Sequence, residues 1–215
     1  YAPQIEIVQN EIWTNDGTGV ISLLGSTGST GITTPFTYPF DADADGDIDY
    51  VELNNGMVDK LYLNNGSGTF TYAQDLSNDF LNTAGRATSG DIDGDTDIDL
   101  IIAIDSIGLE IWKNDGAGVY SLHQTYPISY GNYLVELASF DVDGDLDLYL
   151  SGRGNQPGEI LWNDGSRNFT SSGQSLGTDD DLKHSASGDI DGDFDIDIVV
   201  QTSTGTRFWL NNGFG

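Results

Sequence analysis

Four short segments of the 215-residue sequence carry a carboxylate at almost every second position, a spacing suited to binding a hard metal cation. Close carboxylates repel one another, and each pair costs roughly 3 to 4 kcal/mol at about 4 to 6 Å when the effective dielectric constant is about 20. A calcium ion relieves this repulsion because it accepts about 6 to 8 oxygen ligands in a flexible geometry. The four acidic loops are DADADGDID at Asp41–Asp49, DIDGDTDID at Asp91–Asp99, DVDGDLD at Asp141–Asp147 and DIDGDFDID at Asp189–Asp197.

Other interpretations of these loops fit the residues less well than calcium. Magnesium requires a stricter octahedron with fewer carboxylates. Zinc prefers histidine or cysteine, and the chain has 2 histidines and no cysteine. A solvated acidic turn without any ion would leave the repulsion unrelieved in four copies.

The first loop also matches the EF-hand pattern, which we exclude. Its flanks carry Pro35, aromatic residues and an Asn-Asn-Gly turn, whereas an EF-hand needs a helix on each side. The other three loops lack a glutamate at the twelfth position. The matching residues of the first loop are Asp41, Asp43, Asp45, Gly46, Ile48 and Glu52.

Two sequence markers recur with the same period and predict an internal repeat. The last aspartates of the loops lie at Asp49, Asp99, Asp147 and Asp197, at intervals of 50, 48 and 50 residues. A second marker, an apolar or aromatic pair followed closely by Asn-(Asp/Asn)-Gly, keeps a fixed phase to the first. Its asparagines are Asn15, Asn64, Asn114, Asn163 and Asn211.

The segments between the markers predict short strands. Leu100–Ile104, Leu148–Leu150 and Ile198–Val200 are apolar and follow the acidic loops, and Asn-Gly or Asp-Gly between two such runs is typical of a hairpin. No stretch has the apolar spacing of a helix. The sequence therefore predicts an all-β chain of four-stranded units, which is typical of a β-propeller with about four blades.

We divide residues 1–215, a single repeat domain, into a partial blade at 1–30, blades at 31–80, 81–130 and 131–178, and an incomplete blade at 179–215. Ring closure stays open. Val20 to Leu24 could complete the last blade, the chain could be part of a larger ring, or copies could associate through exposed strand edges.

The charge balance excludes several partners. With 7 lysines and arginines against 35 aspartates and glutamates, the net charge is −28, so no basic face can bind nucleic acid or an anionic membrane. The longest apolar run, Leu100–Ile104, is far shorter than the roughly 20 residues of a membrane span. We therefore expect no membrane insertion.

The acidic loops resemble the FG-GAP and VCBS repeats of integrin α-subunit propellers and secreted bacterial proteins. The resemblance rests on the loops themselves, on Gly90-Asp91 and Gly188-Asp189 where they begin, and on Leu100 or Ile198 after them. This resemblance implies one Ca²⁺ per loop, about four in all, between the first two strands of each blade. It implies ligands at the first, third, fifth and ninth loop residues, with a backbone carbonyl from the seventh.

The resulting candidate metal ligands are Asp41, Asp43, Asp45, Asp47 and Asp49; Asp91, Asp93, Asp95, Asp97 and Asp99; Ser139, Asp141, Asp143, Asp145 and Asp147; and Asp189, Asp191, Asp193, Asp195 and Asp197. The third loop begins either at Ser139 or at Asp141, in which case Tyr149 is last. Either register loses one carboxylate, so we expect the weakest ion binding there. The registers of the second and fourth loops could also shift by two.

Trp13, Trp112, Trp162 and Trp209, with Tyr62 in the equivalent place, recur once per unit. Recurrence favours packing between blades over sugar stacking, and Trp162 lies one residue closer to its asparagine, which indicates a bulge or a shifted face. His123 and His184 have no catalytic partner in any motif, so we expect no enzyme.

Together these features predict an extracellular, calcium-stabilised module, secreted or on the cell surface, for binding or adhesion to a protein or glycan ligand. Extracellular calcium is abundant enough to fill weak sites that the cytosol would leave empty. The alternatives are a carbohydrate-active enzyme similar to propeller polysaccharide lyases, which would use His123 or His184, and a purely structural assembly module.

Overall fold

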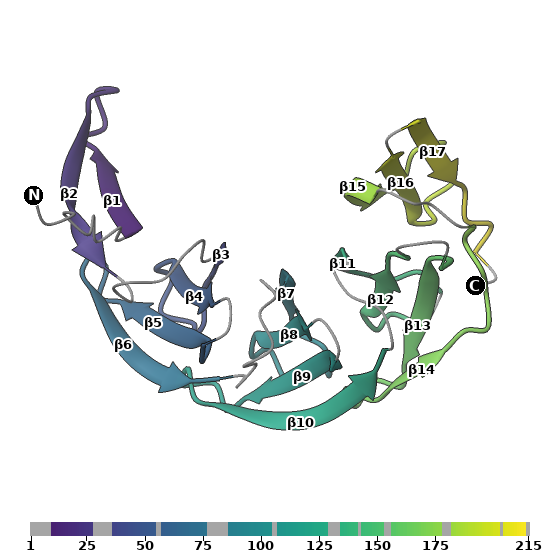
Figure 1. The fold of residues 1–215 in the computed structure, drawn as a ribbon, viewed down its shortest axis with the longest axis horizontal. Helices are drawn as coiled ribbons and strands as arrows, with labels where there is room; N and C mark the ends of the chain where they lie inside the picture. Colours follow the sequence, from purple (N-terminus) through teal and green to yellow (C-terminus); the bar gives the residue numbers. More distant parts are fainter. Residues whose placement is uncertain are drawn as a thin grey trace, which may run out of the picture.

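The protein is an open arc of small antiparallel β-sheets (Figure 1). The computed structural model describes residues 10–27, 36–54, 57–76, 86–104, 107–128, 134–141, 143–152, 156–177, 182–202 and 204–213. Every regular element in these residues is a strand, which confirms the predicted all-β fold. The described residues include no helix of the length and hydrophobicity needed to cross a membrane.

Five sheets follow one another along the chain, and within each the strands pair in sequence order. They are an N-terminal hairpin, β1 (Asn10–Asn15) and β2 (Ile21–Thr27); a first sheet, β3 (Phe36–Phe40), β4 (Asp49–Leu53), β5 (Lys60–Asn64) and β6 (Phe70–Asp75); a second sheet, β7 (Arg86–Gly90), β8 (Asp99–Ile104), β9 (Gly108–Asn114) and β10 (Tyr120–Pro127); a third sheet, β11 (Val135–Ala138), β12 (Asp147–Leu150), β13 (Glu159–Asn163) and β14 (Phe169–Ser171); and a fourth sheet, β15 (Leu182–Gly188), β16 (Asp197–Thr202) and β17 (Gly205–Trp209).

The sheets stand side by side like blades. β3, β7, β11 and β15 lie along the concave side of the arc and β6, β10 and β14 along its convex side (Figure 1). This arrangement is propeller-like. The N-terminal hairpin and the fourth sheet lie at opposite ends of the open arc, so Val20 to Leu24 does not complete the fourth sheet here.

Both faces of the central sheets are buried, because each sheet packs between two neighbours. All six residues of β8 are buried. Leu100, Ile102 and Ile104 pack toward the first sheet, whereas Ile101 and Ala103 pack toward the third. This explains why the strand following the second acidic loop is continuously apolar rather than alternating.

Side chains also join the sheets at their edges. Gln74 of β6 donates from Nε2 to the backbone oxygen of Tyr120 at 2.6 Å and accepts from its backbone N–H at 2.9 Å. On the concave side, the backbone N–H of Ser89 donates to the Tyr38 hydroxyl at 3.2 Å. The backbone N–H of Ser187 likewise donates to Glu136 at 2.6 Å. The first and second sheets are therefore joined at both edges of the arc, and the third and fourth at the concave edge.

Burial of both faces leads to a first prediction. Ile101→Ala and Ile102→Ala should each lower the free energy of unfolding by about 2 to 5 kcal/mol, because each leaves a cavity between a different pair of sheets. Urea denaturation would measure this. Ile190→Ala, at a side chain that is 44% exposed, is the control and should have a small effect. A near-neutral result for either core variant would contradict packing on both faces.

Candidate metal centres

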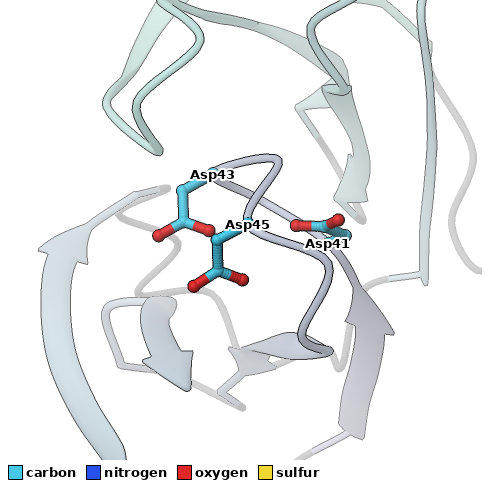
Figure 2. A group of neighbouring side chains, drawn as sticks. All are labelled: Asp41, Asp43 and Asp45. Carbon is cyan, nitrogen blue, oxygen red and sulfur yellow. The ribbon is translucent and has the colours of Figure 1, made fainter. Parts of the chain in front are cut away.

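Each acidic loop connects the first and second strands of its sheet, at one end of the blade. In the first loop Asp41, Asp43 and Asp45 come together (Figure 2), and one oxygen from each lies within 4.8 Å of the others. Oδ1 of Asp41 and Oδ1 of Asp43 are buried and have no hydrogen-bond partner among the described residues. Buried, unpartnered carboxylate oxygens are costly without a cation, so this loop fits a calcium ion.

The backbone curls these loops tightly enough for the carboxylates to converge. In the first, second and fourth loops the fourth and sixth residues have positive φ whether or not they are glycine, as at Ala44 (59°), Gly46 (91°), Thr96 (76°) and Phe194 (76°). The first aspartate accepts hydrogen bonds from this curl: Gly46 N–H donates to Asp41 at 3.1 Å. The equivalent bond runs from Thr96 to Asp91 in the second loop and from Phe194 to Asp189 in the fourth. In these two loops the fourth residue, Gly94 or Gly192, donates to the same aspartate as well.

The ninth residue of each loop is a fully buried aspartate that anchors backbone. Asp49 accepts from the N–H of Ala42 at 2.7 Å through one oxygen and from the N–H of Asn64 at 2.7 Å through the other. Asp147 makes the same pair of bonds to Phe140 and Asn163, and Asp197 to Ile190 and Asn211. Asp99 accepts from the N–H of Asn114 at 2.9 Å. These bonds tie each loop to the Asn-(Asp/Asn)-Gly turn of its own sheet.

In the second, third and fourth sheets the same asparagines also connect each sheet to the one before it. The Asn114 side chain donates to the carbonyl of Ile98 in its own loop and to that of Ala42 in the first loop, at 3.0 and 2.8 Å. Asn163 bridges in the same way to Leu146 and Ile92, and Asn211 to Ile196 and Phe140. The two sequence markers keep the same phase because they are hydrogen-bonded to each other.

These bonds fix the loop registers that the sequence left open. Phe140 N–H donates to Asp147 in the same way as Ala42 N–H, at the second residue of the first loop, donates to Asp49. Phe140 is therefore the second residue of the third loop, which begins at Ser139 and ends at Asp147. The Ser139 hydroxyl donates to the Asp141 carbonyl at 3.1 Å. Asp99 and Asp197 hold the ninth position in the second and fourth loops, with no shift by two.

The seventh aspartates lie against the glycine of the adjacent turn. A Cβ on Gly116, which has φ of 82°, would come within 2.7 Å of Asp97 Oδ2. A larger residue there would therefore strain the backbone and displace the Asp97 carboxylate. The same close approach is found between Gly66 and Asp47, between Gly165 and Asp145, and between Gly213 and Asp195. Whether their carbonyls bind an ion stays a prediction.

The four loops differ in how their carboxylates gather. Asp189, Asp191 and Asp197 form a group like that of the first loop, and so do Asp91, Asp93 and Asp95. Among the described residues of the third loop, Asp141, Asp143, Asp145 and Asp147 form no such group of three. Asp193 lies outside the fourth-loop group, and its Oδ1 accepts from the Asp195 N–H.

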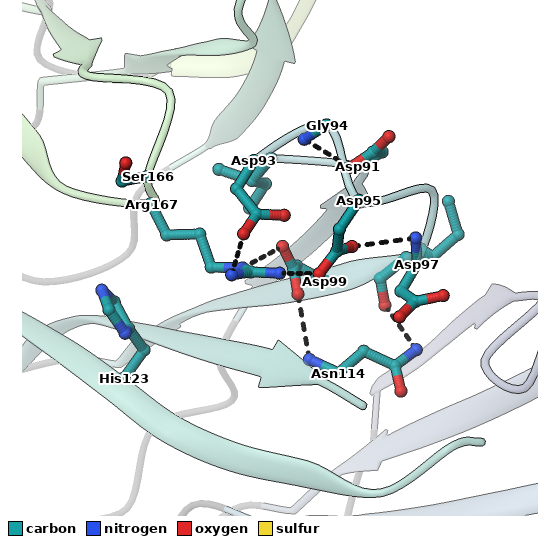
Figure 3. A network of polar contacts seen from close by, with 12 residues as sticks. Asp91, Asp93, Gly94, Asp95, Asp97, Asp99, Asn114, His123, Ser166 and Arg167 are labelled. Atoms are coloured by element: carbon teal, nitrogen blue, oxygen red, sulfur yellow. Dashed lines mark hydrogen bonds and ion pairs between the residues drawn. The ribbon is translucent and has the colours of Figure 1, made fainter. Parts of the chain in front are cut away.

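An arginine from the third sheet enters the second loop (Figure 3). Arg167 forms ion pairs with Asp93, with Asp95 at 2.8 Å and with Asp99 at 2.6 Å, and its side chain is 4% exposed. Burial acts to raise the pKa of Asp95, but hydrogen bonds from Arg167 and from the Asp97 N–H outweigh burial and lower it. Burial opposes the charge of Arg167 as well, yet its hydrogen bonds to Asp99 and Asp95 raise its pKa. Arg167 and Asp99 are 68 positions apart, and no local sequence pattern pairs them.

A pocket lies between the third and fourth sheets, and Trp162 and Trp209 both line it. Its volume is about 230 Å³, and Gln174 stands at its exposed rim. Trp162 packs toward the fourth sheet, whereas Leu161, which takes the position of Trp112, packs toward the second. The one-residue offset of Trp162 therefore turns its ring to the other face, so two tryptophans share one interface.

The remaining sequence candidates lie apart from these features. Trp112 is buried in the core between the first and second sheets, while Trp13 is 56% exposed on the hairpin. His123 on β10 and His184 on β15 are both exposed. His123 lies 3.4 Å from the Asn168 side chain.

Comparisons with known proteins place this architecture. The family model for the FG-GAP-like repeat matches residues 41–102 and 140–200. Among solved structures, the chain is similar to an Agrocybe aegerita lectin described as recognising non-reducing terminal N-acetylglucosamine, with a TM-score of 0.67 and 20% identity over 95% of this chain and 57% of the lectin. The chain thus spans a little over half the length of that lectin. No curated protein matches the sequence.

The buried anchors lead to a prediction about pH. Burial raises the pKa of the Asp147 carboxyl to about 6, above the value of about 3.9 for an unfolded chain. The folded state then binds the extra proton, so the contribution of Asp147 to stability is full below about pH 4 and is lost as pH rises through about 6.

Carbon-13 NMR of the Asp147 carboxyl in calcium-free buffer would measure this titration. The exposed Asp16, whose pKa is lowered by hydrogen bonds from Thr18, is the internal control and should titrate below its ordinary value. A midpoint for Asp147 near 4 would show that its carboxyl is not buried in this way.

Proposed function

The chain belongs to the FG-GAP-like repeat family, and from this premise we propose that it is an extracellular, calcium-stabilised binding module that recognises a glycan. The observation that carries the glycan assignment is the pocket where Trp162 and Trp209 meet between two sheets. Its calcium sites are structural, and we propose no catalytic role for His123 or His184.

Calcium binding is supported most strongly at the first loop. There the carboxylates of Asp41, Asp43 and Asp45 would hold the ion. Two of their oxygens, Oδ1 of Asp41 and Oδ1 of Asp43, are buried and have no other partner among the described residues. The bound ion would neutralise carboxylates in a chain whose net charge is −28. The fourth loop offers Asp189, Asp191 and Asp197 in a similar group. Abundant extracellular calcium would keep such sites filled, which supports placement outside the cell.

Glycan binding is supported by the chemistry of the pocket. Tryptophan rings present apolar faces that suit the C–H face of a sugar, and the amide of Gln174 at the rim can exchange hydrogen bonds with hydroxyl groups. Drug-sized sites typically measure about 300 to 1,000 Å³, so about 230 Å³ suits a single sugar ring at a chain end. The similar lectin recognises a terminal sugar, which favours a glycan over a protein ligand.

Removal of calcium provides the test of the structural proposal. A chelator should lower the melting temperature, because occupancy at 100 times Kd contributes about 2.7 kcal/mol per site. Differential scanning calorimetry with calcium, with magnesium and with chelator would measure it, alongside elemental analysis of the protein. An unchanged melting temperature and no bound calcium would contradict the proposal.

A glycan array with the labelled protein tests the ligand. We expect binding to glycans with an accessible terminal sugar, weakened at least about tenfold by Trp162→Ala or Trp209→Ala, since aromatic contacts dominate such interfaces. Trp13→Ala, on the exposed hairpin, is the matched control and should bind as the wild type does. Circular dichroism would verify folding of each variant.

Three results would contradict the glycan ligand, its site in the pocket or the absence of a catalytic role. Absence of glycan binding would favour a protein ligand or a structural assembly module. Equal loss in Trp13→Ala would move the site away from the pocket. Release of reducing ends from a bound polysaccharide would favour a carbohydrate-active enzyme.

A further inference from the structure

The second acidic loop differs from the others in the residue that faces it. In the turns of the hairpin, first and second sheets, the fourth residue after the asparagine is a glycine with positive φ: Gly19, Gly68 and Gly118. In the third sheet this residue is Arg167, which has a φ of 67°. A bulky side chain therefore occupies a backbone conformation that the equivalent turns give to glycine.

This turn position faces the acidic loop of the preceding sheet. A Cβ on Gly118, in the second sheet, would lie 3.1 Å from the Cβ of Asp43 in the first loop. Glycine at this position sends no side chain toward the three carboxylates of that loop. The equivalent position in the third sheet is Arg167, and its side chain reaches into the second loop (Figure 3).

The guanidinium group uses its three nitrogens on three different carboxylates. Nε lies 2.6 Å from Asp99 Oδ2, one terminal nitrogen lies 2.8 Å from Asp95 Oδ2, and the other pairs with Asp93. Both oxygens of the remaining loop ligand, Asp91, accept hydrogen bonds from the loop's own backbone, from Gly94 and Thr96. Guanidinium stays protonated at any physiological pH, so it is a permanent cation in this position.

We propose that the guanidinium group of Arg167 is the resident cation of the second acidic loop and takes the place of a calcium ion there. It contacts three of the four side chains that the family resemblance assigns to the ion, so the two cations exclude each other. The second and third sheets are consequently joined by an internal ion cluster that needs no calcium. This inference rests on the proposed function for the other loops, which use calcium.

The arginine neutralises only part of the charge of the second loop. Arg167 supplies one positive charge, the loop holds five aspartates, and Oδ1 of Asp93 still has no hydrogen-bond partner among the described residues. Replacing the arginine by glycine would free the oxygens on Asp93, Asp95 and Asp99 beside that unpartnered atom. The loop would then resemble the first loop and should gain a calcium ion.

Crystals of the wild type grown with calcium provide the direct test, through anomalous scattering at a wavelength where calcium scatters strongly. We expect a calcium peak in the first loop and Arg167 in the second. Arg167→Gly, which restores the residue of the equivalent turns, should gain a peak in the second loop and one more calcium per chain by elemental analysis. Arg167→Gln should gain the same ion, and Arg207→Gln, which removes a charge elsewhere, should bind the wild-type number.

A calcium peak in the second loop of the wild type would overturn the inference, as would an unchanged calcium count in both folded Arg167 variants. Absence of calcium from every loop of the wild type would instead refute the proposed function. If Arg167→Gly does not fold, the anomalous map of the wild type and the calcium count of Arg167→Gln still test the inference. Hydrogen exchange adds a second readout: chelator should increase exchange in the first loop more than about tenfold and leave Asp91–Asp99 nearly unchanged.

Discussion

The buried carboxylate that closes each acidic loop is the contact on which the arrangement of the sheets depends. It lies at the first residue of the second strand and holds backbone N–H groups from the loop and from the following hairpin turn, as Asp49, Asp147 and Asp197 show. The asparagine of that turn then donates to the loop of the preceding sheet. One continuous set of hydrogen bonds therefore runs within each sheet and on to its neighbour. The repeat period near 50 residues is the length of chain between one of these aspartates and the next.

The same region concentrates most of the electrostatic cost of the fold. A chain with a net charge of −28 places 19 of its 35 acidic residues in four small loops, and the structure stabilises them in different ways. Backbone N–H groups bond to the ninth residue of every loop. A guanidinium group pairs with three carboxylates of the second loop, and the first loop keeps buried oxygens that suit calcium. Loops that look equivalent in sequence are thus distinct in their chemistry.

The sequence was sufficient to predict the all-β fold, the repeat and the family, because strand runs, Asn-Gly turns and alternating aspartates are local patterns. It could not decide the register of the third loop, since Ser139 and Asp141 offered similar starts and only the bond from Phe140 to Asp147 separates them. The face of Trp162 depended on a one-residue offset that sequence could flag but not resolve. The contact between Arg167 and Asp99 joins residues 68 positions apart, and no local pattern could reveal it.

The arginine in the third sheet also gives the repeats a fixed order. Arrays of similar units commonly grow or shrink by copying or losing one unit, since each contacts only its neighbours. Here the turn carrying Arg167 matches the loop of the preceding unit. A copy inserted between the second and third units would separate that pair, and a loss of the second unit would move the arginine onto the first loop, among Asp41, Asp43 and Asp45. This junction therefore resists the shuffling that the rest of the array tolerates.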